Sequence, residues 1–443
     1  MLCWRSSHAV ELNIKALSVL CTLLLGSMLI LGACGEKSAN PSVSGSPAPA
    51  GGTEKVFRVG ILGPFTGPAA RTGQEFRNAA TMAFEKVGYR IGDYTVELTW
   101  IDEQSDPVKA SRAYEEAIIR DRIEAGLLNW HSSVAVACME VTAKYKIPHF
   151  FGSGATEIVN EKFKSNPDKY GYWMAKIWPT PAKLSVSYVG AVEHAIRSAY
   201  WNPGERTMAI YGEDTDWGRS LGAAFRSQFE AKGWKVLAEE YFPLGETDFY
   251  PLLQKFKRLE VKLLVGSSTA APAISAFVKQ AREVGLRTLT VADGLGWVGE
   301  WYELTGDASD KVIDQNPLWA RPEAKAFRDA YVQKWNEPPS PSSAGLAYDS
   351  ANFFIKLSEA TLRRYGELNR KRLYEFCKEE LWTGQLSYSD GIIMQKYQFT
   401  PETTPDPRVG QGYYMFPVVQ YSAGQSKIIW PLEWQEKELE PPG

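Results

Sequence analysis

Hydroxyl and glycine residues gather at two places where a predicted strand gives way to a predicted helix. Ser132 and Ser133 follow the apolar segment 125–129, and Ser153-Gly154-Ala155-Thr156 follow the apolar segment 147–151. The N-terminus of a helix presents backbone N–H groups without intrahelical partners and carries partial positive charge, so it suits a carboxylate. Ser133 and Thr156 could also be N-caps alone, and capping is compatible with binding.

Cys34 is a second residue with evident chemistry, because it closes the sequence Leu31-Gly32-Ala33-Cys34 after a basic leader and the apolar segment 16–30. This apolar segment is short and has no stop-transfer flank, which favours a secretory signal over a membrane-spanning helix. The four residues resemble a bacterial lipobox, which predicts a signal peptide over 1–33 and lipidation of Cys34. An ordinary signal with an incidental cysteine is the alternative. The Gly-, Ser- and Pro-rich stretch that follows predicts a flexible tether, so that 34–53 form the anchor and its linker.

The common patterns of catalytic and metal sites do not occur in this sequence. None of the 4 histidines has a zinc-like spacing to another ligand, and no nucleophile elbow is found. The first predicted strand is followed by Gly63-Pro64 rather than by the Gly-x-Gly-x-x-Gly turn of dinucleotide-binding enzymes. We therefore expect no enzyme activity, no cofactor and no metal ion.

Net charge, hydropathy and cysteine content limit the class of protein further. A formal net charge of −3 gives no reason to expect nucleic acid or an acidic membrane as a partner. Beyond the leader, no stretch is long and apolar enough to span a bilayer. Cys138 and Cys377 remain after the leader and Cys34 are set aside, and they are either two buried thiols or a disulfide.

The elements that position these residues alternate between strand and helix. Apolar runs at 56–62, 94–102, 125–129 and 147–151 predict buried strands, and helical periodicity fills the intervals between them. A second series begins at Thr207, with strands at 207–211, 261–266 and 288–292 and a helix over 217–232. Such alternation builds parallel sheets covered by helices on both faces, and ligands in such sheets sit beyond the carboxyl ends of the strands. Two α/β lobes with a cleft between them are predicted.

At this point the chain resembles a known family, the leucine/isoleucine/valine-binding type of periplasmic solute receptors for ABC transporters. Several segments carry the resemblance, in order and with family-like spacing, across about 57–431: 59–67, 101–107, 154–157, 209–211 with 217–218, and 277–286. The resemblance implies two doubly wound parallel-sheet lobes joined by three crossing segments, near 178–183, 313–320 and 411–417. It also implies that 54–180 with 318–413 form one lobe and 181–317 with 414–443 the other, and that a helix opened by Tyr348 returns to the first lobe.

The resemblance also implies roles for individual residues. Ser133, Gly154 and Thr156 match the positions that bind the carboxylate of an amino acid. Asp293 falls where the family places the acidic partner of the ammonium group, although an Asp before Gly is also a common turn former. Trp217 matches an aromatic residue that packs on the ligand, with a core role as the alternative.

Departures from the family pattern bear on specificity. Thr72 and Ser268 stand where the family often has tyrosine. Trp130, Trp297 and Trp301 add bulk close to the predicted ligand positions, which favours a pocket shaped for something other than leucine. His131 is expected to be a hydrogen-bonding pocket or core residue rather than a metal ligand.

The sequence therefore predicts an extracytoplasmic, lipid-anchored monomer that binds a small molecule, an amino acid or a related compound, between two lobes. Its expected partners are that ligand, an ABC permease that receives it, and the membrane through the anchor. A ligand-sensing lipoprotein of the same fold, without a permease, is the alternative.

Overall fold

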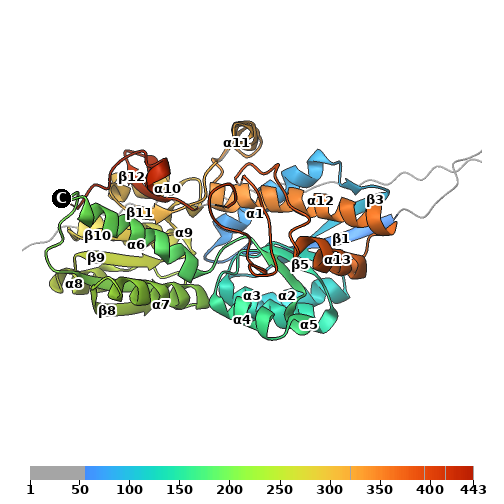
Figure 1. Cartoon of the computed structure of the whole chain (residues 1–443), viewed down its shortest axis with the longest axis horizontal. Helices are drawn as coiled ribbons and strands as arrows, with labels where there is room; N and C mark the ends of the chain where they lie inside the picture. Colours follow the sequence, from blue (N-terminus) through green and yellow to red (C-terminus); the bar gives the residue numbers. More distant parts are fainter. Residues whose placement is uncertain (1–54, 320, 394, 415, 443) are drawn as a thin grey trace, which may run out of the picture. The chain divides into compact units, whose positions relative to one another are not determined.

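The computed structural model describes residues 55–319, 321–393, 395–414 and 416–442. The predicted signal peptide, Cys34 and the whole predicted tether lie outside the described residues. Within the described part, two sheets form separate lobes (Figure 1). The first lobe is built on a sheet with the strand order β2-β3-β1-β4-β5-β6, and the second lobe on a sheet with the order β13-β12-β11-β10-β9-β7-β8.

The strands of the first sheet are β1 Lys55–Gly63, β2 Arg90–Ile91, β3 Tyr94–Asp102, β4 Ala125–Leu127, β5 His149–Gly152 and β6 Trp173–Lys176. Those of the second sheet are β7 Thr207–Glu213, β8 Lys235–Phe242, β9 Leu263–Ser267, β10 Leu289–Asp293, β11 Ile313–Gln315, β12 Val418–Ser422 and β13 Gln425–Trp430. β1 and β7 each pair in parallel with two neighbours. Among the strands of the described residues, the antiparallel pairs are β2 with β3, β11 with β12 and β12 with β13.

Helices cover these sheets. They are α1 Ala70–Lys86, α2 Pro107–Ile119, α3 Ser132–Tyr145, α4 Glu157–Ser165, α5 Pro167–Tyr170, α6 Pro181–Arg197, α7 Asp216–Glu230, α8 Tyr250–Arg258, α9 Ala271–Glu283, α10 Trp301–Thr305, α11 Glu323–Trp335, α12 Leu346–Tyr365 and α13 Arg370–Phe376. In Figure 1 the orange α12 lies against the α1 side of the first lobe, so late sequence returns to the first sheet. Sheets with this helix arrangement are doubly wound α/β sheets, as predicted.

Local sequence explains where these elements begin. β1 has parallel partners on both sides, and its last five residues are buried, which fits its continuous apolar run. Asp106 caps α2 by accepting hydrogen bonds from Val108 N (2.8 Å) and Lys109 N (3.0 Å), and Pro107 occupies the first turn. The chain therefore turns from β3 into α2 close to where the sequence predicts.

Two late elements differ from the expected bounds. The helix expected to open at Tyr348 already begins at Leu346, after a single π-helical turn over Pro341–Gly345. Ser340 starts that turn by accepting a hydrogen bond from Ser343 N (2.9 Å). The family resemblance also implies a strand from Gly412 to Tyr421, and the observed strand begins only at Val418, because Pro417 has no N–H to donate to a ladder.

Candidate functional site

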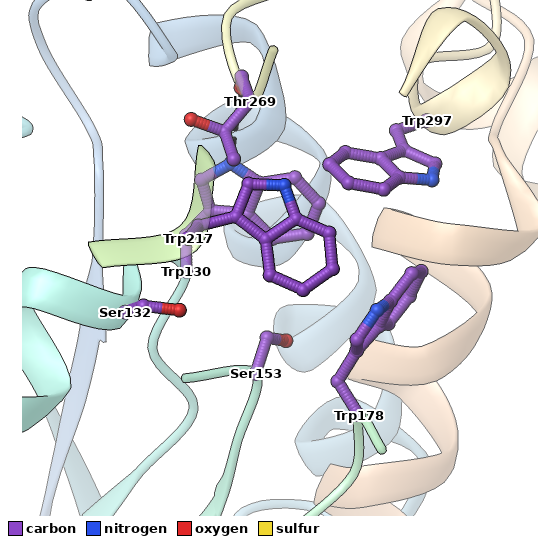
Figure 2. Close-up of a pocket in the computed structure, with 7 residues that line it drawn as sticks. All are labelled: Trp130, Ser132, Ser153, Trp178, Trp217, Thr269 and Trp297. Carbon is purple, nitrogen blue, oxygen red and sulfur yellow. Dashed lines mark hydrogen bonds between the residues drawn. The ribbon is translucent and has the colours of Figure 1, made fainter. Parts of the chain in front are cut away.

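One small cavity is lined by residues from both lobes and from the first segment that connects them. Each lining residue follows the carboxyl end of a parallel strand, the place where open α/β sheets bind ligands. The lining residues are Trp130, Ser132, Ser153, Trp178, Trp217, Thr269 and Trp297 (Figure 2). The space in which the centre of a water molecule could sit amounts to about 20 Å³, so the cavity as it stands holds little more than one water.

Four indoles make up most of the lining. All four tryptophans are buried, with no side chain more than 5% exposed. Trp297 stands at 90° to Trp130, with ring centroids 5.3 Å apart, and at 78° to Trp178, again at 5.3 Å. Trp130 and Trp178 meet at 72° and 6.4 Å. These three rings are nearly perpendicular to one another, so the lining has the shape of a box corner rather than a flat slot.

Hydrogen bonds join the two lobes beside this cavity. Trp130 Nε1 of the first lobe donates to the Thr269 carbonyl of the second at 3.1 Å. The backbone N–H of Asp216, at the start of α7, donates to Ser133 Oγ at 3.1 Å. The Thr156 and Ser220 hydroxyls are 2.9 Å apart. The structure is therefore a closed arrangement in which Ser133 and Thr156 contact the second lobe.

The predicted hydroxyl and glycine residues take distinct places. Thr156 is the N-cap of α4, whereas Ser133 is inside α3 and His131 is the cap residue. The neighbouring Ser132 lines the cavity instead, and its Oγ accepts from Ala155 N (3.1 Å) and Thr156 N (3.3 Å). Gly154 does not line the cavity.

Gly154 is required by packing. A Cβ added there would lie 2.2 Å from the Ala135 Cβ. Its N–H donates to Asn129 Oδ1 at 2.9 Å, which fixes the loop after β5 to the loop after β4. The glycine thus lets the loop after β5 pack closely against α3.

Asp293 reaches the cavity only through other side chains. Trp217 Nε1 donates to Ser267 Oγ at 2.9 Å, and Ser267 Oγ donates to Asp293 Oδ2 at 3.0 Å. The other oxygen of Asp293 accepts from the Tyr188 hydroxyl at 2.6 Å. Burial and the neighbouring Asp314 carboxylate raise the pKa of Asp293 well above its ordinary value. Asp293 does not line the cavity, and its expected pairing with a ligand ammonium stays a prediction.

Ser268 likewise faces the interior of the second lobe. Its hydroxyl donates to Glu213 Oε2 at 3.2 Å, and Thr269 donates to the same carboxylate through its N–H (2.6 Å) and its hydroxyl. Glu213 is fully buried. Among the described residues, its hydrogen-bond partners are hydroxyl and backbone N–H groups and no lysine, arginine or histidine. A buried carboxylate thus stands directly behind the lining residue Thr269.

Several lining residues adjoin the residues that the sequence predicts for the site. Ser132 and Thr269 stand next to the predicted Ser133 and Ser268, and Ser153 stands next to Gly154. Of the bulky residues expected near the ligand, Trp130 and Trp297 line the cavity, whereas Trp301 does not. The sequence places Trp178 only in a crossing segment, and its position directly after the sixth strand is the signal that could have found it.

Other features of the described residues complete the site's surroundings. His131 Nδ1 lies 2.5 Å from Glu103 Oε1, both residues being buried. The described part of the chain holds no group of His, Cys, Asp and Glu side chains fit to bind a metal ion. In the same part, no helix has the length and hydropathy to cross a membrane. Cys138 and Cys377 are buried free thiols.

The family model and the relative that match this chain are both described as binding proteins. A family model described as periplasmic binding protein matches residues 56–425. The Leu/Ile/Val-binding protein homolog 6 of Brucella abortus (strain 2308) is 22% identical over 324 residues, which cover 69% of this chain and 76% of that protein.

Two solved structures have the same fold. A leucine binding protein from Thermotoga maritima MSB8 matches with a TM-score of 0.64 and 18% identity, over 84% of this chain and 97% of its own. A solute binding protein of an ABC transporter from Rhodopseudomonas palustris BisB5, in complex with 3,4-dihydroxy benzoic acid, matches with a TM-score of 0.67 and 21% identity, over 84% and 95%.

Proposed function

The chain belongs to the periplasmic binding protein family, and on that premise we propose that it is a solute receptor that delivers a small molecule to an ABC permease. The family binds solutes outside the cytoplasm and is not enzymatic. The ligand we propose is an amino acid or a related compound. It binds between the lobes and stabilises the closed arrangement through contacts with both of them.

The cavity between the lobes is the observation that carries this proposal. Its lining comes from both lobes and from the connecting segment at Trp178, and three direct hydrogen bonds between the lobes lie beside it. A ligand in this position would contact both lobes and the segment that connects them. Because the present space holds about one water molecule, the lobes must open or the indoles must turn before a larger solute enters.

We assign the site residues accordingly. Trp217 contacts the ligand, together with the six other residues of the lining. Ser133 and Thr156 stabilise closure, because each bonds to the opposite lobe. Gly154, Ser268 and Asp293 hold the lining residues in place from behind.

The anchor and the lobe boundaries belong to the same proposal. Cleavage before Cys34 and lipidation of its thiol tether the receptor to a membrane through 34–53. The chain acts as a monomer, with 54–180 and 318–413 in one lobe and 181–317 and 414–443 in the other. Replacing Cys34 with Ala should release the protein from membranes or leave an unprocessed precursor, and labelled fatty acid that still enters the variant would contradict the anchor.

A melting-temperature screen tests the binding function. Amino acids, methylated amines, amides and aromatic acids are added singly to the purified protein, and a true ligand at about 100 times its dissociation constant should stabilise it by roughly 2.7 kcal/mol. Delivery is tested by uptake of the labelled hit in cells with and without the gene. Binding with unchanged uptake would point to a sensor without a permease, and turnover of the hit would refute a receptor.

A further inference from the structure

The orientation of the indoles limits the shape of a ligand. Trp130, Trp178 and Trp297 stand at 72–90° to one another, and Trp217 meets Trp297 at 58°. A flat aromatic ring is best held between two parallel faces, and none of the four pairs of these indoles that are in ring contact is parallel. Rings that surround a space from several directions instead suit a compact group with substituents on all sides, and such aromatic cages recognise quaternary ammonium ions.

The polar lining does not suit an ordinary ammonium group. A primary ammonium has three N–H donors that need acceptors, and no carboxylate lines the cavity. Most of the acceptors that are present already have donors: the Thr269 carbonyl accepts from Trp130 Nε1, and Ser132 Oγ accepts two backbone N–H groups. The Ser153 hydroxyl has no partner, but one hydroxyl cannot satisfy three N–H donors. A fully methylated ammonium has no N–H and needs no acceptor.

The ionisable group behind the lining is a carboxylate, and a carboxylate attracts a cation. Glu213 is fully buried behind Thr269 and is bonded to hydroxyl and N–H donors. Lysine and arginine side chains do not line the cavity in the described part of the chain. In a buried site of low dielectric, an unneutralised carboxylate stabilises a nearby cation more strongly than it would in water.

Hydrogen-bond donors without partners occupy another part of the lining. Ser153 Oγ and Trp178 Nε1 are buried and have no hydrogen-bond partner, and Ser153 is 6% exposed. Figure 2 shows the hydroxyl groups of Ser132 and Ser153 pointing toward the indoles. Ser132 also begins α3, whose 14 residues direct a partial positive charge to this end. These groups suit a carboxylate.

We propose that the ligand is a zwitterion of the betaine class, in which a quaternary ammonium group is joined through a short chain to a carboxylate. The methyl groups pack against Trp130, Trp178, Trp217 and Trp297, and the carboxylate accepts from Ser153, Ser132 and Trp178. This inference rests on the proposed function, since it takes the interlobe cavity to be the solute site.

Titration calorimetry of the purified protein with four matched compounds tests the class. Glycine betaine should bind most tightly, and dimethylglycine and glycine successively more weakly. The fourth compound, 3,3-dimethylbutanoate, has the same shape and carboxylate as glycine betaine but lacks the positive charge. It should bind about 30-fold more weakly, because it loses the desolvated cation–π interaction.

Variants locate the site. Trp178→Leu and Trp297→Leu should each weaken glycine betaine at least about tenfold, and Trp178→Phe should fall between Trp178→Leu and wild type, because it keeps an aromatic face. Trp335→Leu is the matched control, since Trp335 ends α11 and does not line the cavity. Circular dichroism and melting temperature check that each variant is folded.

The possible outcomes separate the class from the function. Equal affinity for glycine betaine and 3,3-dimethylbutanoate would overturn the class, and an equal effect of the Trp335 control would overturn the location of the site. Binding of leucine or 4-hydroxybenzoate without binding of glycine betaine would also overturn it, while a solute receptor would still stand. If no compound in the wider screen shifts the melting temperature, the receptor function itself fails.

Discussion

Both lobes are built on doubly wound sheets, but carboxylates that are buried in the two lobes have different partners. In the first lobe, Glu103 contacts His131, and the fully buried Lys176 lies 3.0 Å from Asp406. In the second lobe, Glu213 and Asp293 are bonded to hydroxyl and backbone N–H groups, and no basic side chain among the described residues pairs with them. These two carboxylates of the first lobe therefore have basic partners, whereas Glu213 and Asp293, which lie behind the cavity in the second lobe, have none among the described residues. That difference is what a cationic group of a solute would use.

The largest expected effect comes from breaking the pairing in the first lobe. Although burial acts to raise it, Lys176 and Lys183 hold the pKa of Asp406 below its ordinary value. Asp406→Ala leaves Lys176 buried without its partner and should lower the free energy of unfolding by about 3–5 kcal/mol, measured by urea denaturation. Lys183→Met is the control, because Lys183 is 44% exposed and its loss should cost less than about 1 kcal/mol. Equal losses in both variants would contradict the pairing of Lys176 with Asp406.

Glu75 of α1 tests whether a buried carboxylate satisfied largely by hydrogen bonds makes stability depend on pH. It accepts from Gly299 N of the second lobe at 3.0 Å and from Ser340 N at 3.0 Å, and burial raises its pKa to about 7. Between pH 4.5 and 7 the folded chain keeps a proton that the unfolded chain releases, so stability falls as the pH rises. Relative to Glu75→Gln, the wild type should lose up to about 3 kcal/mol over that range. A wild-type to variant difference that stays constant with pH would exclude this behaviour.

Asp293→Asn tests whether Asp293 pairs with the ligand directly or affects binding only through other side chains. If Asp293 acts through Ser267 and Trp217, affinity should fall about five- to tenfold, since one hydrogen bond to the chain weakens. Direct pairing with a ligand ammonium would cost about a hundredfold or more. Calorimetry with the best compound from the screen decides between the two, and Ser267→Ala should reproduce the smaller effect.

The smallest expected effect concerns closure. Thr156→Val removes the hydroxyl contact with Ser220 across the lobes and should weaken binding about fivefold, the equivalent of roughly 1 kcal/mol. Ser220→Ala should do the same. The double variant should be no worse than either single one, because both remove one shared interaction. Additive losses would mean that the two hydroxyls act separately.

The fold could be predicted from the sequence because buried parallel strands have long apolar runs and the helices between them have clear periodicity. The bounds of elements near the end of the chain were harder to predict. The strand β12, for example, begins at Val418, directly after Pro417. The site was located to within one residue in several places. Ser132 and Ser133 differ only in which side of α3 they face, and that depends on the exact start of the helix. The perpendicular arrangement of Trp130, Trp178 and Trp297 could not be predicted, because it brings together residues up to 167 positions apart, as in Trp130 and Trp297.

Locking the lobes together tests most directly whether the solute binds between them. Ser133→Cys with Asp216→Cys introduces two thiols at residues that meet across the lobes, since the backbone N of Asp216 lies 3.1 Å from Ser133 Oγ, and the native thiols of Cys138 and Cys377 are buried. Oxidation after loading should trap the labelled compound against dialysis, and oxidation of the empty protein should abolish binding until the disulfide is reduced. Unchanged affinity in the oxidised, empty protein would contradict a site between the lobes.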